Sequence, residues 1–432
     1  MENLAINDFL SIKSANIELR RINVFIGPQA QGKSIISKLI YFFKEFPTEI
    51  YDSVVESKDK RQFDSSIKSK FEKIFPSYAW EKSQFLIVYN NDEYAIFVEN
   101  KKVSNKYKFT ITYTPNVNKA LSAGRKVFAS YLDFESESGL SGRSRPNIGK
   151  VIRDTVLSLM FRSHDQPRME HVIYIPAGRS FFANLQKSLF SFISSNIPID
   201  YFLKVFGSIY ETTREPAFIK QSAKGRPKSV QKLVDDLLCG IYESEKGQDW
   251  IVGARGKVSL SNSSSGQQEV LPMAIVLSTW PYIISKAFVR SFVIEEPEAH
   301  LFPIAQAKVV ALIAAAYNED FAGGDFVITT HSPYILTAFN NLIQANNAVR
   351  SFADESASEV FEIIPGDQHI RYEDVSAYIV NQGNVTSILD EEYRLIQADA
   401  IDEVSEHFSA TFEKLIGIEA KNNTSGEWDD LI

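Results

Sequence analysis

The sequence predicts an α/β fold in which helices cover both faces of a parallel sheet. Three short apolar runs, Ile22–Ile26, Ser291–Ile294 and Asp325–Thr329, have the length and composition of buried strands. From residue 251 onward, strands and helices alternate, as a parallel sheet requires. The chain has 432 residues, 44% of them hydrophobic and 23% charged, so it can bury a large core without disulfides or metal ions.

The N-terminal segment predicts a strand, a loop and a helix in direct succession. Residues 3–26 alternate as strands do, and the last run, Ile22–Ile26, stops at Gly27-Pro28. The segment Ser34–Phe46 then places apolar side chains on one side of a helix.

The middle of the chain predicts two insertions. Residues 47–80 have a helical pattern, and residues 134–150, rich in Ser, Gly and Arg, predict a mobile loop. Between them, an antiparallel meander is predicted from three β-rich runs: Phe85–Tyr89, Tyr94–Val98 and Tyr107–Tyr113. The apolar run His171–Ile175 predicts another strand. The predicted organisation is a core of residues 1–46, 165–180 and 250–400, an insertion of residues 47–164 with the meander and the mobile loop, a helical insertion of residues 181–249, and a C-terminal helix with a polar tail at residues 401–432.

Composition excludes several classes of protein. The formal net charge of -8 would repel phosphates, so nucleic acid could bind only at a local basic patch. The single cysteine, Cys239, cannot form an internal disulfide, which favours a reducing cytoplasm. The histidine spacing predicts no zinc site. We expect neither a signal peptide nor a membrane helix, because no basic start precedes an apolar run and no run reaches about 18 apolar residues.

A glycine-rich loop carries the strongest chemical signal. Its sequence fits G-x-x-x-x-G-K-[ST] and lies between the predicted strand and helix: Gly27, Pro28, Gln29, Ala30, Gln31, Gly32, Lys33 and Ser34, followed by Ile35. Such a loop surrounds phosphates with backbone N–H groups, and the following helix points its positive end at them. Lys33 would reach the β- and γ-phosphates and the Ser34 hydroxyl would bind Mg²⁺. The alternative is an ordinary glycine turn with an exposed lysine.

Two consecutive carboxylates end the apolar strand before Pro297. In a fold with a phosphate loop this strand lies beside the loop, so Glu295 would hold Mg²⁺ through water. Glu296 would polarise the attacking water. The alternative is that these acids cap a helix.

Small polar residues precede the apolar helix Val270–Trp280. Ser264, Ser265, Gly266 and Gln267 can form an anion-binding turn at its start. A serine-rich loop that ends in an ordinary N-cap explains the same pattern.

A histidine, His331, follows the strand Asp325–Thr329. It lies in the sequence Thr329-Thr330-His331-Ser332-Pro333, about 35 residues after Glu296, where an imidazole can contact a γ-phosphate. A lone histidine after a strand can also be structural.

The order of these motifs (phosphate loop, serine-rich turn, double acid, histidine) resembles AAA-type ATPases of the OLD group. These have ABC-type heads related to those of SMC and RecF proteins. The matching phrases are Ile22–Ser34, Tyr174–Ser180, Ser264–Glu269, Glu295–Leu301 and Thr330–Pro333. The resemblance covers residues 1–45 and 165–400 and implies a P-loop ABC/SMC-head fold.

The resemblance implies a mechanism with ATP and Mg²⁺ between two copies of the chain. The heads would meet head to tail, so that Ser264 and Gly266, in the place of the ABC signature, touch the partner's ATP. The loop from Glu298 to Leu301 would cross the dimer interface. Two roles stay open for Arg179: it either binds phosphate or fixes its loop.

Beyond ATP turnover, the resemblance favours a switch that controls a partner. About 100 residues follow His331, without the acidic pattern of a nuclease, so we expect no nuclease site in this chain. The chain resembles the ATPase components of anti-phage systems such as Septu and PARIS, which control a separately encoded effector, for example a nuclease. The alternatives are a RecF/SMC-like ATPase in DNA repair and a scaffold that uses nucleotide only structurally.

Two basic stretches could contact a DNA backbone. Each could equally be a solvated loop. They comprise Lys220, Lys224, Arg226, Lys228 and Lys232 in one case, and Arg143, Arg145, Lys150 and Arg153 in the other.

Overall fold

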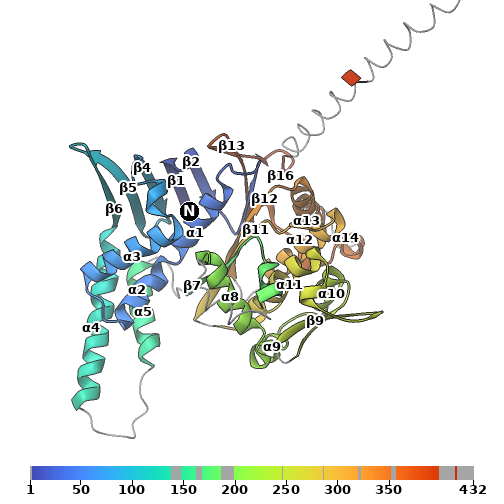
Figure 1. Cartoon of the computed structure of the whole chain (residues 1–432), viewed down its shortest axis with the longest axis horizontal. Coiled ribbons are helices and arrows are strands. Elements are labelled where there is room, and N and C mark those ends of the chain that lie inside the picture. The colour runs from blue at the N-terminus through green and yellow to red at the C-terminus, as the bar shows by residue number, and fades with distance from the viewer. Residues whose placement is uncertain are drawn as a thin grey trace, which may run out of the picture.

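The fold is built on one large twisted sheet with helices on both faces (Figure 1). The computed structural model describes residues 2–137, 147–161, 168–185, 199–245, 247–285, 287–319, 323–351, 357–397 and 414–415. Within these residues, no helix combines the length and the apolar character needed to cross a membrane.

The sheet has a parallel half and a mainly antiparallel half. In sheet order its strands are β6 (Lys106–Tyr113), β5 (Ala95–Val103), β4 (Phe85–Asn90), β1 (Glu2–Phe9), β2 (Ile12–Leu19), β14 (Asn384–Ser387), β13 (Val375–Asn381), β3 (Ile22–Ile26), β12 (Gly323–Thr330), β11 (Phe288–Glu295) and β7 (Met169–Ile175). The five strands from β13 to β7 run parallel, so their carboxyl ends meet at one edge. The predicted apolar runs all lie in this parallel half.

Alternation along β3 separates two hydrophobic cores. Ile22, Val24 and Ile26 face one core and Phe25 faces the other. The helices on the Phe25 side are α1 (Lys33–Lys44), α2 (Phe46–Val55), α3 (Lys60–Ile74), α4 (Pro115–Glu137) and α5 (Ile148–Met160). The helices on the other side are α6 (Phe181–Leu185), α8 (Tyr201–Thr213), α10 (Lys228–Leu238), α11 (Ser265–Leu277), α12 (Pro303–Tyr317) and α13 (Pro333–Ser351). Helix α9 (Pro216–Ser222) contacts α8, and α14 (Ala357–Ile363) contacts α13.

The predicted antiparallel meander is confirmed, and it extends the main sheet instead of forming a sheet of its own. Strand β4 pairs with β1, with Ile6 opposite Ile87. Helices α4 and α5 project side by side from this end of the molecule (Figure 1). The predicted mobile loop at 134–150 lies mostly outside the described residues. Its two ends belong to α4 and α5.

The helical prediction for residues 181–249 is wrong at its C-terminal end. Strands β8 (Ile241–Glu245), β9 (Gln248–Gly253) and β10 (Gly256–Ser259) form a small antiparallel sheet there. The turn between β8 and β9 uses Gly247 at a φ of 77°, a conformation that favours glycine. The predicted C-terminal helix and tail lie outside the described residues, apart from Lys414 and Leu415. Short strands β15 (Leu389–Asp390) and β16 (Leu395–Ile396) precede them.

A buried charge cluster lies at the amino edge of the parallel strands. The Lys44 ammonium, at the end of α1, lies 3.0 Å from a Glu2 oxygen, 3.4 Å from Glu170 and 2.7 Å from Asp325. Ser291 donates to Glu170 and accepts the Asp325 amide. The cluster therefore joins α1, β1, β7, β11 and β12. Burial raises the pKa of Glu170 to about 7, because desolvation outweighs the attraction of Lys44.

This raised pKa predicts a pH-dependent stability. The folded state binds the Glu170 proton more tightly than the unfolded chain. Its contribution is therefore fully present below the ordinary pKa and is lost as pH rises through about 7. Relative to Glu170→Gln, we expect the wild-type free energy of unfolding to fall by about 1–3 kcal/mol between about pH 5 and pH 8. Urea denaturation at several pH values measures it, with Glu72→Gln on α3 as a surface control. Parallel pH profiles for wild type and Glu170→Gln would refute this.

Candidate functional site

The glycine-rich loop connects β3 to α1 at the carboxyl edge of the parallel strands. A Cβ atom at Gly27 would lie 2.1 Å from the backbone oxygen of Val380, so only glycine fits there. Gly32 precedes α1 with a left-handed φ of 107°. The chain thus turns sharply from strand to helix, and the first amides of α1 face the space above the loop.

This loop borders a pocket of about 310 Å³. Its lining includes nearly the whole predicted phosphate loop together with the predicted acid and histidine. The residues are Ser11, Gln29, Ala30, Gln31, Gly32, Lys33, Ser34, Ile35, Glu296, Thr329 and His331. Three motifs far apart in the sequence therefore meet at one place.

Lys33 is the buried cation of this pocket. Its ammonium donates to the backbone oxygens of Gly27 and Pro28, each at 2.7 Å. Desolvation lowers the pKa of Lys33 to about 8, although Glu296 and Glu298 act in the opposite direction. A bound phosphate would attract the charged ammonium of Lys33 and so offset the desolvation.

His331 connects this lysine to the predicted catalytic acid. Its Nδ1 lies 3.2 Å from the Lys33 ammonium, and its Nε2 lies 3.2 Å from a Glu296 oxygen. A charged lysine can only donate, so Nδ1 accepts and Nε2 carries the proton that it donates to Glu296. The contacts therefore select one neutral tautomer. Glu296 itself adopts a φ of 44°, which is strained for a non-glycine residue and turns it out of the strand direction.

Glu298 holds the histidine loop. One of its carboxylate oxygens accepts the backbone N–H of His331 at 2.6 Å. The other oxygen is buried without a partner among the described residues. Glu298 is the first residue of the loop that was expected to cross a dimer interface, and its side chain contacts its own chain.

Glu295 lies behind the pocket, buried in the sheet edge. Ser37 donates to one of its oxygens at 3.5 Å and lies 3.0 Å from the Tyr174 hydroxyl. Burial and the Glu295 charge raise the pKa of Tyr174, which keeps this hydroxyl neutral. Sequence reasoning did not assign these two supporting residues, although Tyr174 lies in a matching phrase.

The Ser37 hydroxyl joins the two residues expected to hold a magnesium ion with the nucleotide, because it donates to the Ser34 backbone oxygen at 3.1 Å and to a Glu295 oxygen at 3.5 Å. Such an ion takes most of its oxygens from phosphates and water, and the protein adds only one or two. The described residues contain no group of three or more His, Cys, Asp and Glu side chains placed to hold a metal ion.

Arg179 has the contacts that the loop-fixing alternative predicts. Its side chain is fully buried and donates to the backbone oxygens of Pro176, Glu269, Glu295 and Glu296 at 2.7–3.0 Å. The Glu269 carboxylate in turn accepts the amides of Arg179 and Ser180 at 2.9 and 3.0 Å. All of these contacts lie within the chain, so Arg179 positions the double acid.

The serine-rich turn starts α11 but lies apart from the phosphate pocket. Ser264 caps the helix in a reciprocal capping box with Gln267, as the N-cap alternative predicted. A separate cavity of about 430 Å³ is lined by Ser263, Ser264, Gln267 and Arg255, and it shares no residue with the phosphate pocket. Ser265 is exposed, and Gly266 packs against the backbone oxygen of His300.

A turn near the C-terminus completes the phosphate loop. The Gln382 amide donates to the Gln31 side chain at 2.7 Å, and Val380 lies against Gly27. This turn joins β13 to β14. Its sequence carries no phosphate-binding signal, so only the fold shows that it belongs to the site.

The basic stretches have different positions. Lys220 and Arg226 line a cavity beside α9 and α10, whereas Lys224, Lys228 and Lys232 do not. Lys150 and Arg153 lie on α5. Arg143 and Arg145 lie outside the described residues.

Comparison with known proteins places the sequence within one family. The sequence profile described as AAA ATPase domain matches residues 1–336. A search of the curated proteins finds no match.

Among solved structures, the chain is similar to SMC heads. The SMC head domain from Thermotoga maritima has 14% identity and a TM-score of 0.36, covering 90% of this chain and 98% of that one. The SmcHead bound to the C-winged helix domain of ScpA has 12% identity and a TM-score of 0.42, covering 91% and 99%. The Smc head domain with an extended coiled coil bound to the C-terminal domain of ScpA, from Pyrococcus furiosus, has 11% identity and a TM-score of 0.36, covering 94% and 99%. These likenesses are distant.

The Arg179 network predicts a large loss of stability on truncation. Arg179→Met leaves the buried Glu269 carboxylate without its cation and several backbone oxygens without donors. We expect a loss of about 3–5 kcal/mol in the free energy of unfolding, measured by urea denaturation. Arg61→Met, on the exposed face of α3, is the control and should change stability by less than about 0.5 kcal/mol. A similarly small effect for Arg179→Met would show that the network is not stabilising.

Proposed function

Because the chain belongs to the AAA ATPase domain family, we propose that it is an ATP-hydrolysing switch in which two copies close head to tail around ATP and Mg²⁺. The observation that supports closure by two copies is the separation of the phosphate pocket from the serine-rich turn. A head-to-tail pair would bring the turn of one copy to the phosphate loop of the other.

The residues of the phosphate pocket have distinct roles in this proposal. The Gln29–Ile35 backbone and the Lys33 ammonium would bind the phosphates, and Ser34 with Glu295 would hold the ion that neutralises them. Glu296 would orient the attacking water and take its proton, and its strained backbone keeps the carboxylate in the pocket. His331 would hold Glu296 and contact the γ-phosphate.

Exposed apolar side chains beside the site favour contact with a second copy. Phe302 is 77% exposed and Ile304 is 67% exposed, at the start of α12 directly after the Glu298–Leu301 loop. Tyr334, just after the histidine loop, is 54% exposed. Large exposed apolar residues that directly follow two loops of the site support an interface there.

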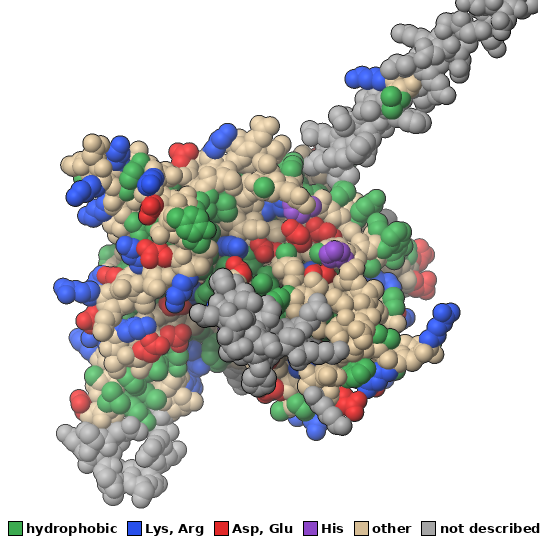
Figure 2. Space-filling model, in the orientation of Figure 1, with side chains coloured by type: hydrophobic (Ala, Val, Ile, Leu, Met, Phe, Trp, Pro, Cys, Tyr) green, Lys and Arg blue, Asp and Glu red, His purple; other side chains and the backbone are tan. Residues whose placement is uncertain are grey.

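In this proposal the switch acts in the cytoplasm and controls a separate effector, such as a nuclease, in anti-phage defence. The support is the resemblance of its motifs to such ATPases. On the face that Figure 2 shows, the described Lys and Arg side chains are mixed with acidic and apolar ones and do not gather in one patch, so this face does not support DNA contact.

ATP turnover tests the chemistry. We expect the wild type to release phosphate from ATP, and Glu296→Gln and Lys33→Ala to lose at least about 100-fold of that rate, since each removes a group used in the transition state. Glu296→Gln should still bind ATP, whereas Lys33→Ala should not. If the wild type binds ATP without turnover, a nucleotide-gated scaffold replaces the switch.

Mixing two inactive variants tests the two-copy site. Lys33→Ala damages the phosphate loop, and Ser264→Arg blocks the turn that would face the partner. A mixed pair contains one site with both parts intact, so turnover should return when the two proteins are combined. A mixture of Lys33→Ala with Glu296→Gln is the control, since both changes damage the same half of the site. No recovery in the first mixture would contradict head-to-tail closure.

The lowered pKa of Lys33 predicts weaker ATP binding at alkaline pH. Below about pH 8 the lysine is charged. Above that pH the free protein loses this proton, which must be regained on binding, so affinity should fall by up to about tenfold per pH unit. Titration with a fluorescent ATP analogue at several pH values measures this. Lys33→Arg stays charged and is the control, so an identical decline in both proteins would exclude Lys33 as the cause.

A further inference from the structure

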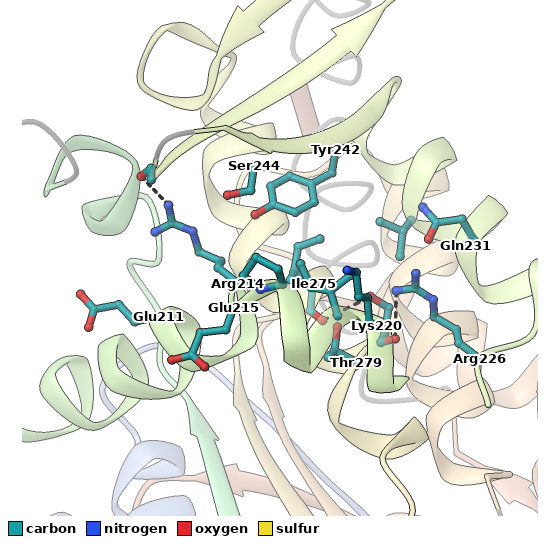
Figure 3. A pocket seen from close by; sticks show the side chains of 15 residues that line it. Glu211, Arg214, Glu215, Lys220, Arg226, Gln231, Tyr242, Ser244, Ile275 and Thr279 are labelled. Carbon is teal, nitrogen blue, oxygen red and sulfur yellow. Dashed lines mark hydrogen bonds between the residues drawn. The ribbon is translucent and has the colours of Figure 1, made fainter. Parts of the chain in front are cut away.

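A cavity of about 710 Å³ lies among α8, α9, α10, β8 and the end of α11 (Figure 3). It shares no residue with the phosphate pocket or with the cavity at the serine-rich turn. Its volume is within the range of sites that hold drug-sized or nucleotide-sized ligands.

The walls of this cavity, here called the α11 cavity, offer apolar contacts for a planar ring of a ligand and groups that can form hydrogen bonds with it. Apolar contacts come from Ile219, Val234, Ile275 and the ring of Tyr242. Polar groups that can reach a ligand come from Gln231, Ser244 and Thr279. Such a combination of apolar area with a few polar groups suits a planar molecule with hydroxyl or amide edges.

Charges of opposite sign occupy opposite sides of the cavity. Figure 3 shows Glu211 and Glu215 on one side and Lys220 and Arg226 on the other. Arg214 is already neutralised, because it lies 2.9 Å from the Asp249 carboxylate.

The two cations on the second side have free donors. Within the described parts of the chain, neither Lys220 nor Arg226 forms an ion pair, and the bond found for Arg226 is a 3.3 Å contact to the Ser278 backbone oxygen. Burial lowers the pKa of Arg226, because desolvation outweighs the attraction of Tyr282 and Asp235. An anion bound here would satisfy both groups.

The shape of the cavity argues against a DNA duplex. Of the five basic residues in the stretch from Lys220 to Lys232, Lys220 and Arg226 line a concave wall, whereas Lys224 does not. A duplex presents its phosphates to an open face and could not enter such a space. A single phosphate on a small molecule could.

We propose that the α11 cavity binds a mononucleotide, with its phosphate on Lys220 and Arg226 and its base on Tyr242 and Ile275. The ribose hydroxyls and base donors would face the acidic side. Since α11 carries Ile275 at one end and the serine-rich turn at the other, the ligand would also change ATP turnover. This second effect rests on the proposed function, whereas binding does not.

Calorimetry with UMP and GMP tests the binding. The titrations use Lys33→Ala protein, so the phosphate loop does not contribute. We expect both mononucleotides to bind, and Lys220→Gln/Arg226→Gln to weaken them at least about tenfold, the usual effect of losing bonds to a charged group. Lys224→Gln is the matched control, an exposed lysine of the same stretch outside the cavity, and should bind as the parent does. The single variant Lys220→Glu, at an exposed position, repeats the test without altering the half-buried Arg226.

Uridine and inorganic phosphate separate the parts of the ligand. Each alone should bind more weakly than UMP. The proposal is overturned if no mononucleotide binds, if inorganic phosphate binds as well as UMP, or if Lys224→Gln weakens binding as much as the double variant. These outcomes do not depend on whether the wild type hydrolyses ATP, so failure here is distinguishable from failure of the proposed function.

Discussion

The buried guanidinium of Arg179 holds helix α11 in a fixed position relative to the double acid, Glu295 and Glu296. Its donors satisfy backbone oxygens at the carboxyl ends of β7 and β11, and its charge is offset by Glu269 on α11. A fully buried charge is tolerated only when such partners surround it. The cost of burying it therefore disfavours any arrangement in which α11 moves away from the double acid.

The elements that end at the phosphate pocket are also fixed at their other ends. Helix α1 runs from Lys33 to Lys44, and Lys44 binds carboxylates at the starts of β7 and β12. Ser291 of β11 joins the same cluster. If α1 or one of the strands β7, β11 and β12 slid past the others, polar contacts at both of its ends would break. A movement of the phosphate loop would therefore shift α1 and these strands as one unit.

The sequence predicted those parts of the site that are formed by residues adjacent in the chain. The loop from Gly27 to Ser34 was predictable because its strand, glycines and helix are adjacent in the chain. The places of Glu295 and His331 were predictable because Glu295 ends one apolar strand and His331 follows another. The Val380–Gly383 turn was not, since its place over the loop depends on β13 pairing with β3, some 350 residues earlier in the chain. The pairing of Arg179 with Glu269 also joins distant segments. A buried acid within an apolar helix could have signalled it, because such an acid needs a partner.

Helix α11 unites these observations. Its first residues form the turn that is separate from the phosphate pocket, Glu269 ties it to the double acid through Arg179, and its last turn lines the α11 cavity. A packed helix moves as a body, so a ligand at one end changes the energy of contacts at the other only if the helix has two arrangements. Closure by a second copy would supply the second arrangement, because it adds contacts at Ser264–Gln267 that one copy lacks. Contact of Ser264–Gln267 with a partner's nucleotide would then change the position of Glu296 through Arg179. A ligand beside Ile275 would favour or oppose the same arrangement of α11 without touching ATP.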